Sequence, residues 1–308
     1  MNFKSISFSF FLLFLISFFG VNAQNIEVNN VCLFNETNLL KNLKTLSSDF
    51  YEGRRTGTVG AKRAKKYIIN QFYKLGVLKK GKSYEQPFRF YHRGQYYDGV
   101  NVLGFIKGTS LSKKHIVISA HYDHEGIKQG EIYNGADDNA SGVSALFAFA
   151  EYYKKYPPKH SIILAAFDAE ELGLRGSKYF VNNTSLNLKT ISLNVNLDMI
   201  SRSDKNQLYV AGTAYNKSLK YVLSNSKKSK KISVLPGHDG YDGLDNWTYA
   251  SDHANFHKKE IPFLYFGVED HKDYHEPTDD FENINPKFYV EAVKSIILIL
   301  NKIDNSNF

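Results

Sequence analysis

Residues 114–123 read KHIVISAHYD, and the pattern of this stretch recurs along the chain. Its first seven residues are mostly apolar or β-branched, which predicts a buried strand over residues 114–120. His121 and Asp123 follow at the end of that strand. In open α/β sheets the ligand site lies at the carboxyl ends of the strands, so these two polar side chains indicate a candidate site.

Three later runs repeat the arrangement. They are SIILAAF (161–167), followed by Asp168, Glu170 and Glu171; TISLNVNL (190–197), followed by Asp198; and IPFLYFG (261–267), which ends a few residues before His275. Helical patterns over residues 143–153 and near residues 287–303 alternate with these strands. The alternation predicts an α/β sandwich whose central sheet is largely parallel.

The polar residues at these strand ends, with those of the segment GADDNASG (135–142), have the composition of a metal centre. Two histidines and several carboxylates form the ligand set that zinc favours, and the carboxylates exceed what one tetrahedral ion needs. Two metal ions that share a carboxylate would use them all. Asp138 lies just before the helix predicted over residues 143–153, where backbone N–H groups and the helix dipole favour a carboxylate.

Each of these segments has a simpler explanation when it is taken alone. A His-x-Asp sequence is commonly a hydrogen-bonded surface pair, and Glu170-Glu171 would commonly be the solvated start of a helix. Asp198 is harder to explain in this way, because an unpaired carboxylate at the end of an apolar strand is costly to bury. The joint pattern favours the metal centre.

In their order and spacing, these segments resemble metallopeptidase family 28, the secreted two-zinc aminopeptidases related to leucyl aminopeptidase. The resemblance covers nearly all of the chain after its first residues and includes residues 46–58, 120–123, 135–142, 170–171, 196–199, 251–256 and 274–280. It implies a three-layer α/β/α sandwich with a central mixed, largely parallel sheet of the zinc exopeptidase kind.

The same resemblance implies a role for individual residues. Asp138 would bridge two zinc ions, with His121 and Asp198 completing one site and Glu171 and His275 completing the other. Glu170 would be the general base, and Tyr274 would stabilise the developing oxyanion. Asp123 and Asp252 would support the metal ligands without binding the metals themselves, and Asp123 would orient the imidazole of His121. A cis peptide bond is expected after Asp138.

The loop 236–249 is rich in glycine and aromatic residues and leads towards Ser251, Asp252 and His253. A loop of this composition beside an active site can form the wall of a pocket for an apolar side chain. Trp247 and Tyr249 are therefore the predicted substrate contacts, whereas His253 is predicted to be structural.

The first residues indicate the compartment. Lys4 is followed by an apolar stretch over residues 6–19 and by small residues before Gln24, which is the pattern of a signal peptide over residues 1–23. Cleavage would leave a single catalytic domain, residues 24–308, of 308 − 23 = 285 residues. Two helices are expected over residues 36–75, with Gly76 as the stop of the second. The protein is expected to be secreted or periplasmic, without a stable membrane anchor.

The distribution of the basic residues, which are spread along the chain, argues against a nucleic-acid partner. The chain carries +8, and loss of Lys4 with the signal peptide would leave +7. The densest basic cluster, KKSKK (227–231), has no interleaved aromatic residues, unlike a surface that contacts nucleic acid. A monomer is favoured.

Four functions are compatible with this sequence. The favoured one is a zinc aminopeptidase that removes N-terminal residues from peptides or proteins. The same fold also includes glutaminyl cyclases, which are one-zinc aminoacyltransferases, and non-catalytic binding proteins that have lost the ligands. Against both, His121 and the run 138–142 resemble the peptidase form and Glu170 is present. Carboxypeptidase specificity remains open, because the metal residues do not show which end of a peptide is bound.

Overall fold

The strands predicted from the sequence lie side by side in one large sheet. The computed structural model describes residues 32–306, and the predicted signal peptide, residues 1–23, lies outside that range. The described residues belong to one compact unit that begins at Cys32.

The nine-stranded sheet is mixed, with a parallel centre. The parallel strands β7, β4, β8 and β11 lie next to one another in that order. Antiparallel strands flank them, β3 beside β7 and β9 beside β11. The strands are β1 (Leu78–Lys79), β2 (Glu85–His92), β3 (Gln95–Ile106), β4 (Leu111–His121), β7 (His160–Phe167), β8 (Ile191–Leu197), β9 (Gln207–Ala211), β10 (Ser233–Pro236) and β11 (Phe263–Gly267), and a separate hairpin pairs β5 (Gly126–Lys128) with β6 (Glu131–Tyr133).

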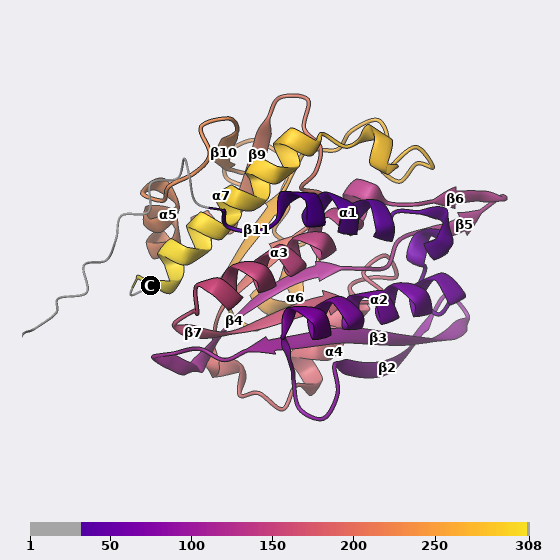
Figure 1. Cartoon of the computed structure of the whole chain (residues 1–308), viewed down its shortest axis with the longest axis horizontal. Helices are drawn as coiled ribbons and strands as arrows, with labels where there is room; N and C mark the ends of the chain where they lie inside the picture. Colours follow the sequence, from indigo (N-terminus) through magenta and orange to yellow (C-terminus); the bar gives the residue numbers. More distant parts are fainter. Residues whose placement is uncertain (1–31, 307–308) are drawn as a thin grey trace, which may run out of the picture. The chain divides into compact units, whose positions relative to one another are not determined.

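Helices cover both faces of the sheet, which confirms the three-layer sandwich. Figure 1 shows α1, α2, α3 and α7 in front of the sheet and α4 and α6 behind it. The α-helices are α1 (Glu36–Leu46), α2 (Val59–Leu75), α3 (Gly142–Lys155), α4 (Arg175–Asn183), α5 (Lys217–Ser224), α6 (His253–His257) and α7 (Pro286–Asp304). The two helices predicted over residues 36–75 are α1 and α2, joined through a 3₁₀ turn (Asp49–Arg54). Gly76 ends α2 with a φ of 77°, as predicted.

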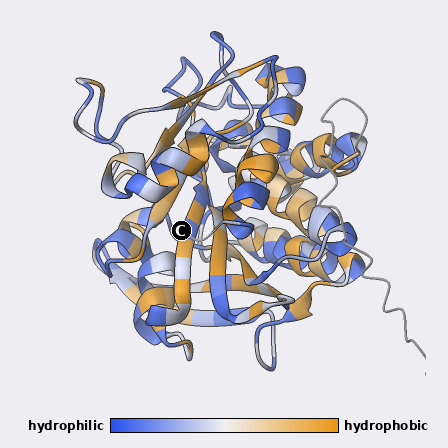
Figure 2. Ribbon diagram, turned by 90° about the vertical axis from the view of Figure 1, so that its left-hand side faces the viewer, coloured by the Kyte–Doolittle hydropathy of each residue, from blue (hydrophilic) through white to orange (hydrophobic). Residues whose placement is uncertain are grey.

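The central strands are apolar because both of their faces are covered. Every residue of β7 is buried, and Figure 2 shows hydrophobic residues concentrated on the central strands. On the face of α4 and α6, Phe167 packs against Phe180 and Phe256, with ring centroids 5.6 and 6.2 Å apart. This packing places the strand ends precisely, because close-packed interiors resist displacement.

The parallel direction of β7, β4, β8 and β11 brings their carboxyl ends to one edge of the sheet. His121 is the last residue of β4, and Asp198 directly follows β8. Glu170 comes three residues after the end of β7. The candidate ligands therefore meet at this edge, as the sequence predicted.

Within residues 32–306, none of the helices combines the length and the apolar character needed to span a membrane.

A buried group of hydrogen bonds to Asp304 joins the end of α7 to the start of β7. Asp304 Oδ1 accepts from the backbone N–H of His160 at 2.9 Å and lies 2.8 Å from His160 Nδ1, while Oδ2 accepts from the N–H of Lys159 at 2.7 Å. Burial alone would raise the pKa of Asp304, but these hydrogen bonds outweigh it and lower the pKa. Asp304 therefore stabilises the fold in its charged form.

We expect Asp304→Asn to lower the free energy of unfolding by about 1–3 kcal/mol at neutral pH, because charge-assisted hydrogen bonds are lost. Since the folded pKa lies below the unfolded value of about 3.9, the contribution is complete above that value and is lost as the pH falls through the folded pKa. Urea unfolding of both proteins between pH 7 and 3 measures the difference. If the difference in unfolding free energy between the two proteins did not become smaller in acid, this account would be contradicted.

Candidate metal centre

The two carboxylate oxygens of Asp138 face two different histidines. Oδ1 lies 3.1 Å from His121 Nε2, and Oδ2 lies 3.2 Å from His275 Nε2. Asp138 is almost fully buried, with 3% of its surface exposed. One carboxylate is thus shared between two groups of side chains.

Each histidine also meets a further carboxylate. His121 Nε2 lies 3.2 Å from Asp198 Oδ1, and His275 Nε2 lies 3.5 Å from Glu171 Oε2. The predicted ligands therefore come together in two groups around Asp138. Glu170 approaches the first group, since its carboxylate lies within 4.8 Å of ligand atoms of His121 and Asp198.

The donor set fits zinc. Nitrogen and oxygen ligands bound at 2.0–2.2 Å in tetrahedral geometry lie roughly 3.4 Å from one another, close to the separations between histidine and carboxylate found here. The fit is also electrostatic, because several carboxylates cluster at the end of the sheet. Burial raises the pKa of Glu170, attraction to His121 opposes this, and the neighbouring Glu171 and Asp198 raise the pKa further. Bound cations would offset that repulsion.

A distorted turn holds Asp138 in place. The peptide bond between Asp138 and Asn139 is cis, as expected. The backbone N–H groups of Asp137 and Asp138 both donate to the carboxylate of Asp279, at 2.9 and 3.0 Å. Asn139 Oδ1, and not the carboxylate of Asp138, accepts from the N–H of Gly142 at the start of α3. The side chain that bonds to the N-terminus of α3 is therefore Asn139 and not, as predicted, Asp138. The Asp138 carboxylate is free to face the histidines.

Asp123 supports the site differently from the prediction. The nearest acceptor for His121 Nδ1 is the main-chain oxygen of Asp123, at 3.0 Å, whereas the carboxylate is 3.8 Å away. The carboxylate instead accepts from the backbone N–H groups of Glu170, at 3.0 Å, and Glu171, at 3.3 Å. The main chain of Asp123 thus orients the histidine, and its side chain fixes the turn that presents Glu170 and Glu171.

The residues around α6 lie behind the centre. Asp252 is fully buried, and burial raises its pKa to about 6 although His121 attracts its charge. The neighbouring His253 contacts the main-chain oxygen of Trp247 through Nε2 at 2.8 Å and stacks on Phe263, which agrees with a structural role.

A cavity of about 330 Å³ opens over the metal groups. Trp247 and Tyr249 line it, as predicted, and so do Tyr274 and Tyr265. Trp247 is held by His238, whose ring stacks on it with centroids 3.5 Å apart. Tyr274 stacks on His275 with centroids 4.0 Å apart, so its position is tied to a predicted ligand. The lining of the cavity thus combines carboxylates and histidines with aromatic rings.

His124 is a site residue that the sequence reasoning missed. It is fully buried, and its Nδ1 lies 3.0 Å from Glu171 Oε1 and 3.6 Å from Asp138 Oδ2. Gly135 makes room for the ring, because a Cβ at that position would come within 2.5 Å of it. His124 follows Asp123 in the same motif, so its position next to the predicted residues was the available signal.

Arg54 is a second missed residue. Its buried guanidinium donates to four main-chain oxygens, those of Leu46, Tyr122, Asn134 and Gly135. Burial lowers its pKa to about 10, and attraction to Asp138 and other nearby carboxylates opposes this, so it stays charged. Arg54 therefore ties the ends of the loops that carry His121 and Asp138 and adds a positive charge beneath the carboxylates.

We expect His124→Phe to lower the affinity for metal at the Glu171 side by about 10–100-fold, because Glu171 loses the group that orients it. Zinc titration against a competing chelator measures this affinity. His92→Phe, on β2, is the matched control and should bind metal like the unchanged protein. Equal affinity in the His124 variant would show that the contact has no influence on the metal.

Comparisons with known proteins identify the family of this chain. The model of peptidase family M28 matches residues 101–299. Aminopeptidase YwaD of Bacillus subtilis is 33% identical over 62% of this chain, and the match spans 42% of that protein.

Solved structures share the fold. One is BSAP, a zinc aminopeptidase from Bacillus subtilis, with a TM-score of 0.70 and 18% identity over 88% of this chain and 95% of that one. Another is the glutaminyl cyclase of Porphyromonas gingivalis, with a TM-score of 0.70 and 17% identity over 89% of this chain and 99% of that one. The family match covers well over half of the sequence. The chain therefore belongs to peptidase family M28.

Proposed function

We propose that this protein is an exported two-zinc aminopeptidase that releases N-terminal residues from peptides. The observation that carries the proposal is the Asp138 carboxylate, whose two oxygens face separate groups of histidine and carboxylate at the floor of one cavity. His121, Asp138 and Asp198 would hold one ion, and Asp138, Glu171 and His275 the other. Export after cleavage near Ala23 is supported by the composition of residues 1–23.

When bound, the two ions would polarise the scissile carbonyl and activate a water molecule. Glu170 is the carboxylate left over once each group has its ligands, and the turn fixed by Asp123 presents it towards His121 and Asp198. It would accept the proton of the attacking water and deliver it to the leaving amine.

Tyr274 would donate its O–H to the oxyanion that forms at the carbonyl. Burial, together with the nearby Asp138 and Asp198, raises the pKa of Tyr274. The phenol therefore keeps its proton, as a hydrogen-bond donor must.

The charge of the cavity favours the amino end of a peptide over the carboxyl end. Among the described residues that line it, five are carboxylates and none is lysine or arginine; the five are Asp138, Glu170, Glu171, Asp198 and Asp270. Four of the five would be occupied by the metals or act as the base, which leaves Asp270 to attract a free α-ammonium, whereas the lining offers no cationic side chain to capture a terminal carboxylate. This argues against carboxypeptidase specificity.

An assay of leucine release from an N-terminal leucine chromogenic amide tests the proposal. We expect release that stops on chelation and returns with zinc. Release of ammonia from an N-terminal glutamine peptide, with no leucine release, would instead indicate a glutaminyl cyclase, a fold relative among the solved structures.

Two variants separate the roles of the carboxylates. Glu170→Gln should lower kcat by about 10²–10⁴-fold, the typical contribution of a general base, with zinc content unchanged. Asp138→Asn should lose zinc as well as activity, because both metal groups depend on it. Glu131→Gln, at an exposed position on β6, is the control. A Glu170 variant that retained most of its activity would refute the assignment of the base, and one that lost zinc would make Glu170 a ligand.

A further inference from the structure

A further carboxylate, that of Glu125, lies beside the second metal group. Glu125 directly follows His124, and one of its ligand atoms lies within 4.8 Å of ligand atoms of both Glu171 and His275. Its side chain is only 18% exposed. Glu171 and His275 line the cavity over the metal groups, whereas Glu125 is not part of that lining. Glu125 is therefore close to the second group without facing the space in which a substrate would bind.

Two cations bind the carboxylate of Glu125. Its Oε2 lies 2.8 Å from Lys128 Nζ and 3.3 Å from Arg55 Nη1. Arg55 Nη1 also donates to the main-chain oxygen of Glu125, at 3.2 Å. Each cation has a contact of its own: Lys128 Nζ lies 4.6 Å from the centre of the Tyr133 ring, and the stem of Arg55 packs over Gly126, where a Cβ would come within 2.6 Å of it. These contacts hold the carboxylate on the side of the cations.

The position of Glu125 matters because the number of protein ligands decides what a zinc ion can do. Catalytic zinc sites have three protein ligands and keep a further position for water or substrate, whereas four protein ligands close the site. Asp138, Glu171 and His275 already supply three ligands to the second group. Glu125 would be the fourth, and a carboxylate this close to a cation is attracted to it unless other charges hold it.

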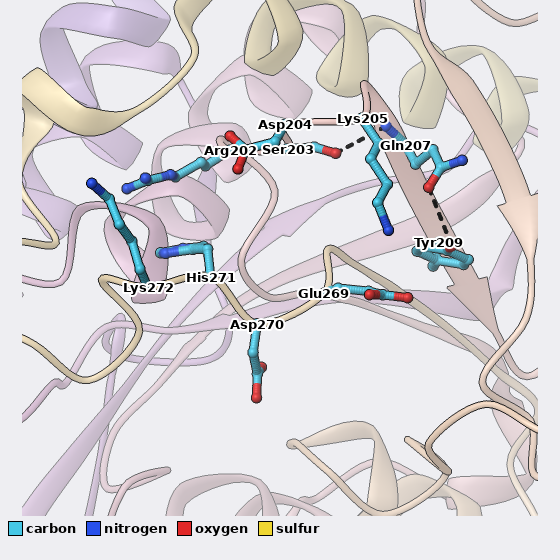
Figure 3. Close-up of a pocket in the computed structure, with 10 residues that line it drawn as sticks. All are labelled: Arg202, Ser203, Asp204, Lys205, Gln207, Tyr209, Glu269, Asp270, His271 and Lys272. Carbon is cyan, nitrogen blue, oxygen red and sulfur yellow. Dashed lines mark hydrogen bonds between the residues drawn. The ribbon is translucent and has the colours of Figure 1, made fainter.

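Asp270 offers a comparison, because it is also a carboxylate without a ligand role. It lines the cavity, but within residues 32–306 it belongs to none of the groups whose ligand atoms lie within 4.8 Å of one another. Figure 3 shows the Asp270 side chain directed away from Arg202, Lys205 and Lys272. The carboxylate that cations restrain is thus Glu125, the one within reach of a metal group.

We propose that Arg55 and Lys128 keep Glu125 away from the second metal ion and so preserve the open position at which water or substrate binds. Arg55 and Lys128 are then positioning residues, which act through Glu125 and touch neither metal nor substrate. This inference rests on the proposed two-zinc function and adds a requirement to it: the second ion must have three protein ligands and not four.

The double variant Arg55→Gln, Lys128→Gln tests the proposal, because it releases Glu125. We expect the affinity for zinc at the Glu171 side to rise by about tenfold, equivalent to about 1.4 kcal/mol. We expect kcat for leucine release to fall by about tenfold or more, because the open position is then filled. Zinc titration against a competing chelator and the chromogenic assay measure the two effects. In a zinc-loaded crystal of this variant, an oxygen of Glu125 should lie about 2.0–2.2 Å from the ion.

Two further variants separate this role from a general effect of charge. Adding Glu125→Gln to the double variant should return both zinc affinity and kcat towards their original values. Lys128→Gln alone, a change at a partly exposed side chain, should shift both quantities in the same direction by a smaller factor. Lys220→Gln, an exposed lysine on α5, is the matched control and should change neither.

Unchanged zinc affinity and kcat in the double variant, with only a lower free energy of unfolding, would overturn the proposal and leave these ion pairs as a structural link. A rise in affinity that persists in the triple variant would also overturn it, since the loss of positive charge would then be the cause. If the unchanged protein released no leucine, the proposed function would fall, whereas the zinc titrations would still decide the role of Glu125.

Discussion

The structure of the site depends on one carboxylate that faces two ways. Asp138 places one oxygen towards His121 and the other towards His275, residues that come from opposite ends of the catalytic region of the chain. Both groups of side chains contact it. The turn that presents Asp138 and its support from Asp279 keep this side chain between the two histidines.

Gathering carboxylates at one edge of a sheet has an electrostatic cost, and the protein offsets part of it with its own groups. Burial would raise the pKa of Asp138, but the surrounding histidines lower it well below its usual range. Arg54 adds a buried positive charge and binds the main-chain oxygens of Tyr122 and Gly135. The remaining negative charge is what two bound cations would balance. The same cluster of carboxylates therefore accounts for the positive groups that surround it and for the cations that it would bind.

Local patterns predicted the strands and the polar residues that follow them, whereas the role of each candidate ligand came from the resemblance to family 28. Apolar runs identify the strands, and His121 and Asp198 come directly after them. The sequence did not reveal the role of the Asp123 side chain, since whether a carboxylate contacts a neighbouring ring or a distant N–H depends on how β4 and β7 are aligned. His124 and Arg54 were missed for a related reason: each acts through main-chain or side-chain groups far away in sequence.

Anomalous X-ray diffraction at the zinc absorption edge, from crystals of the purified protein, tests the central claim most directly. The account predicts two zinc peaks roughly 3.5–4 Å apart, one on each side of the Asp138 carboxylate. One peak lies beside His121 and Asp198, and the other beside Glu171 and His275. A single peak, or two peaks that do not share Asp138, would contradict the bridging role from which the proposed function is derived.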